Sequence, residues 1–86
     1  MQIIINTGDN MVMGCVLIKL VPGMDKKAFD SIKKLESKGT YALFGVYDAL
    51  MMVEAGDIKE LTSFVVDNIR NIEGVESTRT MIGAEI

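Results

Sequence analysis

The sequence has 86 residues, a length that predicts one domain with one hydrophobic core over residues 1–86. It is 49% hydrophobic and 24% charged, a balance typical of an ordinary folded protein rather than a disordered or fibrous one. The net charge is −3, and Lys and Arg are scattered between acidic residues, which argues against direct nucleic-acid binding. Because no apolar run suits a membrane span or a signal peptide, we predict a cytoplasmic protein without membrane contact.

Several kinds of catalytic chemistry are excluded by what the sequence lacks. There is no histidine, so His-based general bases, Ser-His or Cys-His nucleophiles and His-rich metal sites are ruled out. The only cysteine, Cys15, sits in an apolar run and is predicted to pack in the core. The glycines occur singly, so no Gly-rich phosphate loop is present. We therefore predict no catalytic residue, no metal site and no cofactor.

The first quarter of the chain is predicted to be extended. Residues 1–13 form a short N-terminal extension with a strand at Gln2–Asn6, a turn, and a second extended piece at Met11–Met13. Cys15–Val21 is predicted to be the first full strand, and its apolar residues occupy both alternating faces. Pro22 ends it.

A helix and a hairpin are predicted next. Asp25 is placed to cap a helix and Gly39 to end it. The apolar face of this helix is formed by Ala28, Phe29, Ile32 and Leu35. Residues 40–44 then form a strand, residues 45–48 a turn, and residues 49–55 a strand that is again apolar at both parities.

The last third of the chain predicts a second helix and a final strand. Gly56 and Asp57 open the helix, and Asp57 with Glu60 has the spacing of a capping box. The apolar face consists of Ile58, Leu61, Phe64, Val65, Ile69 and Ile72. Gly74 lies just past the helix end, and residues 75–82 form the last strand.

The element order β-α-β-β-α-β favours a ferredoxin-like α+β fold, in which a four-stranded antiparallel sheet carries both helices on one face. Right-handed crossovers place the first and third strands in the centre, and these are the strands with apolar residues at both parities. The second face then needs a partner. We predict a homodimer, a dimeric α+β barrel whose sheets pack face to face. Its interface is predicted to contain Leu17, Leu50, Met51 and Met52.

Polar residues at two strand ends are candidates for a binding site. Asp48 stands beside Tyr47 just before an apolar strand, where it is either a turn residue bonded to its own backbone or a group that meets a small zwitterion. Thr78 and Thr80 share one face of the last strand with Arg79 between them. Exposure on an edge strand is the simpler explanation for the two threonines.

The turn Gly45-Val46-Tyr47-Asp48, the apolar strand that follows it, and the segment Gly74-Val75-Glu76-Ser77-Thr78-Arg79-Thr80 together resemble the effector domain of the Lrp/AsnC family, also called the RAM domain. The resemblance covers residues 15–82. It implies dimers that assemble into rings, often octameric, and that bind amino acids or related metabolites where dimers meet. Carried over by position, it nominates Gly45, Tyr47, Asp48, Thr78 and Thr80 as ligand-binding residues.

Regulators of this family carry a helix-turn-helix domain before the effector domain. Because only about fourteen residues precede the first full strand here, we expect a stand-alone effector domain that does not bind DNA itself and that could associate with a full-length Lrp/AsnC regulator. The alternative is a small cofactor-free enzyme of the dimeric α+β barrel type. A third reading is a structural assembly protein that binds no small molecule.

Overall fold

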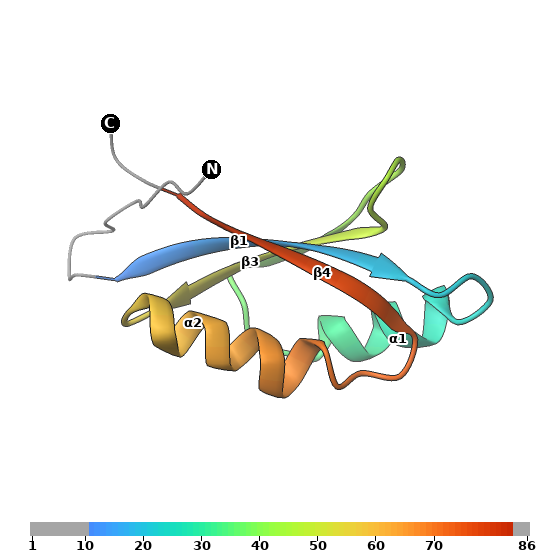
Figure 1. The fold of residues 1–86 in the computed structure, drawn as a ribbon. Helices are drawn as coiled ribbons and strands as arrows, with labels where there is room; N and C mark the ends of the chain where they lie inside the picture. The colour runs from blue at the N-terminus through green and yellow to red at the C-terminus, as the bar shows by residue number, and fades with distance from the viewer. Residues whose placement is uncertain (1–10, 84–86) are drawn as a thin grey trace.

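The computed structural model describes residues 11–83, so the predicted strand at residues 2–6 lies outside the described part. The elements follow one another in the predicted order (Figure 1). They are β1 (Val12–Leu20), α1 (Asp25–Lys33), β2 (Gly39–Ala42), β3 (Ala49–Ala55), α2 (Ile58–Phe64), the π-helical continuation η1 (Val65–Ile69) and β4 (Val75–Ile82). This is the βαββαβ arrangement of the ferredoxin-like α+β fold.

The strands form one antiparallel sheet in the order β2-β3-β1-β4. The first and third strands are therefore central, as the crossover rule predicted. Both helices lie on the same face of this sheet, below it in Figure 1, and the opposite face is left uncovered. The prediction of a half-covered sheet is confirmed for residues 11–83.

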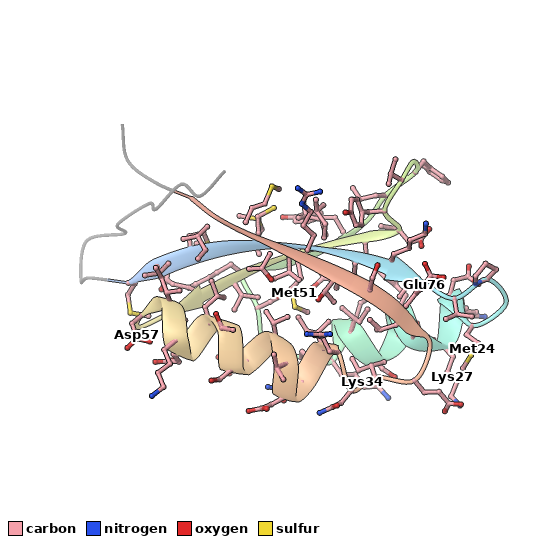
Figure 2. All side chains as sticks on the ribbon, in the orientation of Figure 1. Met24, Lys27, Lys34, Met51, Asp57 and Glu76 are labelled. Carbon is pink, nitrogen blue, oxygen red and sulfur yellow. The ribbon has the colours of Figure 1, made fainter. Side chains whose placement is uncertain are left out.

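The core lies between the helices and the sheet. Alternate residues of the two central strands point into it, including Val16, Ile18 and Met51, which have no exposed surface. The helices contribute Ala28, Ile32, Leu61, Val65 and Ile69. Within residues 11–83 every buried side chain is apolar. Figure 2 shows Met51 between the sheet and the helices.

The start of the sheet differs from the prediction. Met11–Met13 and Cys15–Val21 were expected as two separate extended pieces, whereas β1 is a single nine-residue strand. Gly14, which separated them in the prediction, is buried under Leu61 and pairs with Val53. A glycine here lets the helix approach the strand closely and does not interrupt pairing.

Both predicted ends of the first helix are wrong. Asp25 is the first helical residue, and Met24 occupies the cap position without a side-chain hydrogen bond. The Asp25 carboxylate instead lies in the first turn, where the helix dipole favours it. The helix ends at Lys33, and Gly39 opens β2 next to Lys38, whose N–H bonds the Met52 carbonyl at 2.8 Å. The chain needs residues 34–38 to cross from the helix layer to the sheet.

The second helix begins as predicted. The Asp57 carboxylate accepts a hydrogen bond of 2.7 Å from the Glu60 N–H, which caps the helix. The helix then widens into η1, where the Arg70 N–H bonds the Val65 carbonyl at 3.0 Å. Leu61, Val65 and Ile69 are spaced by four and are all buried. In a helix of 3.6 residues per turn, residues spaced by four rotate gradually away from one face, and the wider turn offsets this rotation.

Asp57→Ala should lower the free energy of unfolding by about 1 kcal/mol, because the first helical turn loses its side-chain acceptor. Urea unfolding followed by circular dichroism measures this. Lys59→Ala on the same exposed turn is the matched control and should change stability by less than about 0.5 kcal/mol. Equal effects of the two substitutions would contradict a capping role.

Candidate functional site

The face of the sheet that the helices leave uncovered is mostly apolar. Strand register places Leu17 between Leu50 and Arg79, and Cys15 between Met52 and Met81. Side chains on the middle of this face come from all four strands: Tyr41, Leu50, Met52, Cys15, Leu17, Arg79 and Met81. The polar residues Lys19, Ser77 and Glu54 lie on the same face towards the strand ends.

Two expectations for this face need correction. Met51, predicted at the dimer interface, points the other way and is fully buried under the helices, because its neighbours Leu50 and Met52 take the uncovered face. Cys15, predicted to pack in the core, is half-buried on the uncovered face, since its alternate neighbours Gly14 and Val16 point to the core. Burial still raises the pKa of the Cys15 thiol, so it stays protonated at neutral pH.

The hairpin between β2 and β3 rises on the uncovered side of the sheet (Figure 1). Its tip carries Phe44, which is fully exposed, and Val46, which is 76% exposed. Gly45 between them has φ +138°, a backbone conformation that favours glycine. An apolar tip on a tight, closed hairpin is typical of a contact surface.

Asp48 joins this hairpin to the central strand. Its carboxylate accepts a hydrogen bond of 2.8 Å from the Leu20 N–H, and its own N–H bonds the Ile18 carbonyl at 2.9 Å. The pairing of β1 with β3 ends at Ile18 and Ala49, so the carboxylate stands where a strand carbonyl would otherwise be. The side chain therefore bonds a residue distant in sequence, and not its own turn as the simpler explanation supposed.

The five predicted ligand-binding residues do not line one cavity in a single chain. Tyr47 and Thr80 line a depression of about 610 Å³ beside β4. Gly45 and Asp48 line a second one of about 740 Å³ at the end of β1, and Thr78 lines neither. The remaining residues of the first depression are Cys15, Leu17, Arg79, Met81, Ile82 and Gly83.

The register of β4 explains in part why the five predicted residues do not lie together. Thr78 pairs with Ile18 and Thr80 with Val16, so both threonines lie on the helix side of the edge strand. Arg79, between them, lies on the uncovered face. Sequence reasoning placed the threonines on one face correctly but did not single out Arg79. The signal that could have identified Arg79 is its position in the alternation of the last strand, which places it on the same face as Cys15.

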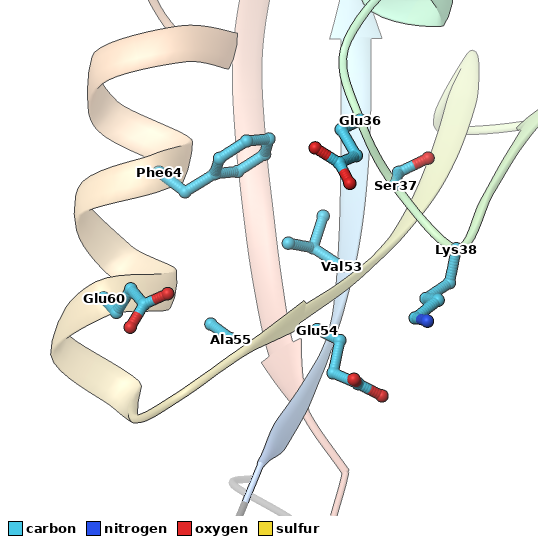
Figure 3. Close-up of a pocket in the computed structure, with 8 residues that line it drawn as sticks. All are labelled: Glu36, Ser37, Lys38, Val53, Glu54, Ala55, Glu60 and Phe64. Atoms are coloured by element: carbon cyan, nitrogen blue, oxygen red, sulfur yellow. The ribbon is translucent and has the colours of Figure 1, made fainter.

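A third depression, of about 410 Å³, lies between α2 and β3. Figure 3 shows Phe64 and Glu36 facing each other across Val53. Its polar lining is Glu36, Ser37, Lys38, Glu54 and Glu60, and none of the predicted ligand-binding residues reaches it. Across residues 11–83, no group of three His, Cys, Asp or Glu side chains is arranged to hold a metal ion.

Comparison with known proteins identifies the family. The model of the Lrp/AsnC ligand-binding domain matches residues 15–85. The chain belongs to this family. Members of the family are regulatory ligand-binding domains and typically not enzymes. No curated protein matches the sequence.

Solved structures share the fold of this Lrp/AsnC domain. TTHA0845 from Thermus thermophilus is 28% identical with a TM-score of 0.78, covering 87% of this chain and 95% of that one. AsnC from E. coli is 21% identical with a TM-score of 0.79, covering 92% of this chain. A Neisseria meningitidis regulator, NMB0573, in complex with L-Met is 20% identical with a TM-score of 0.77, covering 93%. The domain spans 54% of AsnC and 52% of NMB0573. Among residues 11–83, no helix has the length and hydropathy to cross a membrane.

Asp48→Ala in this domain should lower the free energy of unfolding by about 1–3 kcal/mol, because the half-buried Leu20 N–H loses its acceptor. Asp48→Asn keeps an acceptor oxygen and should have a smaller effect. Urea unfolding of both variants measures the difference. If both retain wild-type stability, the hydrogen bond to Leu20 is not what holds the hairpin against β1.

Proposed function

We propose that this domain is an oligomeric regulatory module that binds an amino acid or related metabolite and does not bind DNA itself. The observation that carries the proposal is the depression of about 610 Å³ on the uncovered face, which combines apolar walls with the polar residues Tyr47 and Arg79. A small acid with an apolar side chain needs this combination. Membership of a ligand-binding family and the L-Met complex of NMB0573 support the same class of ligand.

Assembly is part of the proposal. Leu17, Leu50 and Met52 would pack against the same face of a second copy and form a homodimer, from which rings such as octamers would be built. Assembly would also bring the hairpin residues Gly45 and Asp48 of one chain towards the binding residues of another, which a single chain keeps in separate depressions. A full-length Lrp/AsnC regulator is a further candidate partner, through the same sheet face. The cytoplasmic location stays a prediction.

The enzyme alternative would place its polar groups between the helices and the sheet. There the buried side chains of residues 11–83 are apolar, and charged residues such as Glu36, Lys38 and Glu60 line only the open depression beside α2. Differential scanning fluorimetry against the twenty amino acids and their 2-oxo acids tests the binding function, with native mass spectrometry to follow assembly. We expect at least one compound to raise the melting temperature and to shift the distribution of oligomers. Unchanged melting temperatures and unchanged masses with every compound would support a purely structural assembly protein instead.

A further inference from the structure

Arg79 is an unusual residue for the surface on which it lies. It pairs with Leu17 across the sheet and shares its depression with Met81 and Cys15. Its guanidinium makes no ion pair with any residue between 11 and 83. Lys19, on the same face, is paired with Glu76 at 3.8 Å. Arg79 is thus a cation without a counter-ion, within residues 11–83, at the edge of an apolar face.

This position matters once a second copy covers the face, as the proposed function requires. Removing a guanidinium from water without an anionic partner is strongly unfavourable. Because no residue between 11 and 83 forms an ion pair with Arg79, we infer that the partner subunit or a ligand supplies the counter-ion in the assembly. Glu76 of β4 is already paired with Lys19, and Glu54 lies at the far end of β3 and lines the depression next to α2. The depression beside Arg79, at about 610 Å³, is large enough for a small acid.

The lining of this depression defines the chemistry of that acid. Arginine binds a carboxylate through two parallel N–H donors. Tyr47 lines the same depression and carries a hydroxyl that could donate to a further oxygen, and Met81 offers apolar contact. Among residues 11–83, no carboxylate lines it. Asp48, which a zwitterion would need for its ammonium group, lines the other depression and already accepts the Leu20 N–H.

We propose that Arg79 anchors the carboxylate of a small apolar acid that has no ammonium group, with 2-oxo acids as the class of ligand. The proposal rests on the proposed function and narrows the class of ligand that this function assigns to the domain. An amino acid would bring an ammonium group into a site where residues 11–83 provide a cation but no anion. The corresponding 2-oxo acid keeps the carboxylate and the side chain, and it replaces the ammonium with an oxygen that the Tyr47 hydroxyl can bond.

Matched pairs of ligands test this by isothermal titration calorimetry on the full chain. The 2-oxo acids of leucine, valine and methionine are each compared with their own amino acid. We expect at least one 2-oxo acid to bind at least tenfold more tightly than its amino acid. Arg79→Gln should weaken that binding at least tenfold, and Arg79→Lys should recover part of it. Arg70→Gln, on the exposed end of the second helix, is the control and should leave binding unchanged.

Three results would overturn the proposal. The first is an amino acid that binds as tightly as its 2-oxo acid; this leaves the proposed function intact. The second is 2-oxo acid binding that Arg79→Gln does not change. The third is an equal weakening of dimerisation by Arg79→Gln and Glu54→Gln without ligand, which would pair Arg79 with Glu54 of the partner subunit. The proposed function itself fails only if neither amino acids nor 2-oxo acids bind.

Discussion

Leu61→Ala is expected to lower the free energy of unfolding by about 2–5 kcal/mol, a large share of the stability of a small domain. Leu61 is fully buried on the inner face of α2 and packs directly over Gly14 of β1. A Cβ at Gly14 would approach Leu61 Cδ2 to 2.5 Å and Cδ1 to 2.8 Å. Such a separation requires the Leu61 side chain or one of the two elements to shift. The pair therefore sets how closely the second helix approaches the sheet.

This geometry predicts coupling between the two positions. Gly14→Ala alone should cost about 1–3 kcal/mol, because the new methyl group would clash with the buried Leu61 side chain. In the Leu61→Ala background the same methyl group enters the vacated space, so its additional cost should fall close to zero. Chemical unfolding of the wild type, both single variants and the double variant measures this coupling as a double-mutant cycle. Leu17→Ala, on the other face of β1, is the control and should be additive with Gly14→Ala.

The sequence predicted the last two strands more accurately than the first helix. The bounds of β3 and β4 agree with the prediction. β3 is defined by an apolar run whose residues occupy both faces of the strand. β4 starts directly after Gly74, which has φ +98°. The end of α1 was misplaced since Leu35 continues the apolar spacing after the helix has stopped at Lys33. A glycine such as Gly39 is equally compatible with a helix end and a strand start.

The candidate site was predicted in part for a related reason. Parity along the chain identifies which side chains share a strand face, and Thr78 and Thr80 were paired correctly on that basis. Parity alone does not say which face is covered, so Met51 and Met52 could not be told apart before the register was known. The hydrogen bond from the Leu20 N–H to Asp48 joins residues 28 apart and has no sequence pattern of its own. Tertiary contacts of this kind decide whether a carboxylate is available to a ligand.

Phe44→Ser is expected to raise the dissociation constant of the assembly at least tenfold while leaving the fold intact. The Phe44 side chain is fully exposed at the hairpin tip, so its loss should change the free energy of unfolding by less than about 0.5 kcal/mol. Burying a phenylalanine against another copy contributes about 1.5–3 kcal/mol, and about 1.4 kcal/mol corresponds to a tenfold change in affinity. A symmetric dimer would lose this contribution twice.

Sedimentation velocity over a range of protein concentrations measures the effect, with urea unfolding of the same samples to separate assembly from stability. Val66→Ser is the matched control, because Val66 is 42% exposed on the second helix, which lies on the other side of the sheet from the hairpin. It should leave the dissociation constant unchanged. Equal effects of the two variants would indicate that any exposed apolar residue promotes association. An effect of Phe44→Ser alone would assign the contact to the uncovered side of the sheet, on which the hairpin rises and Leu17 and Met52 also lie.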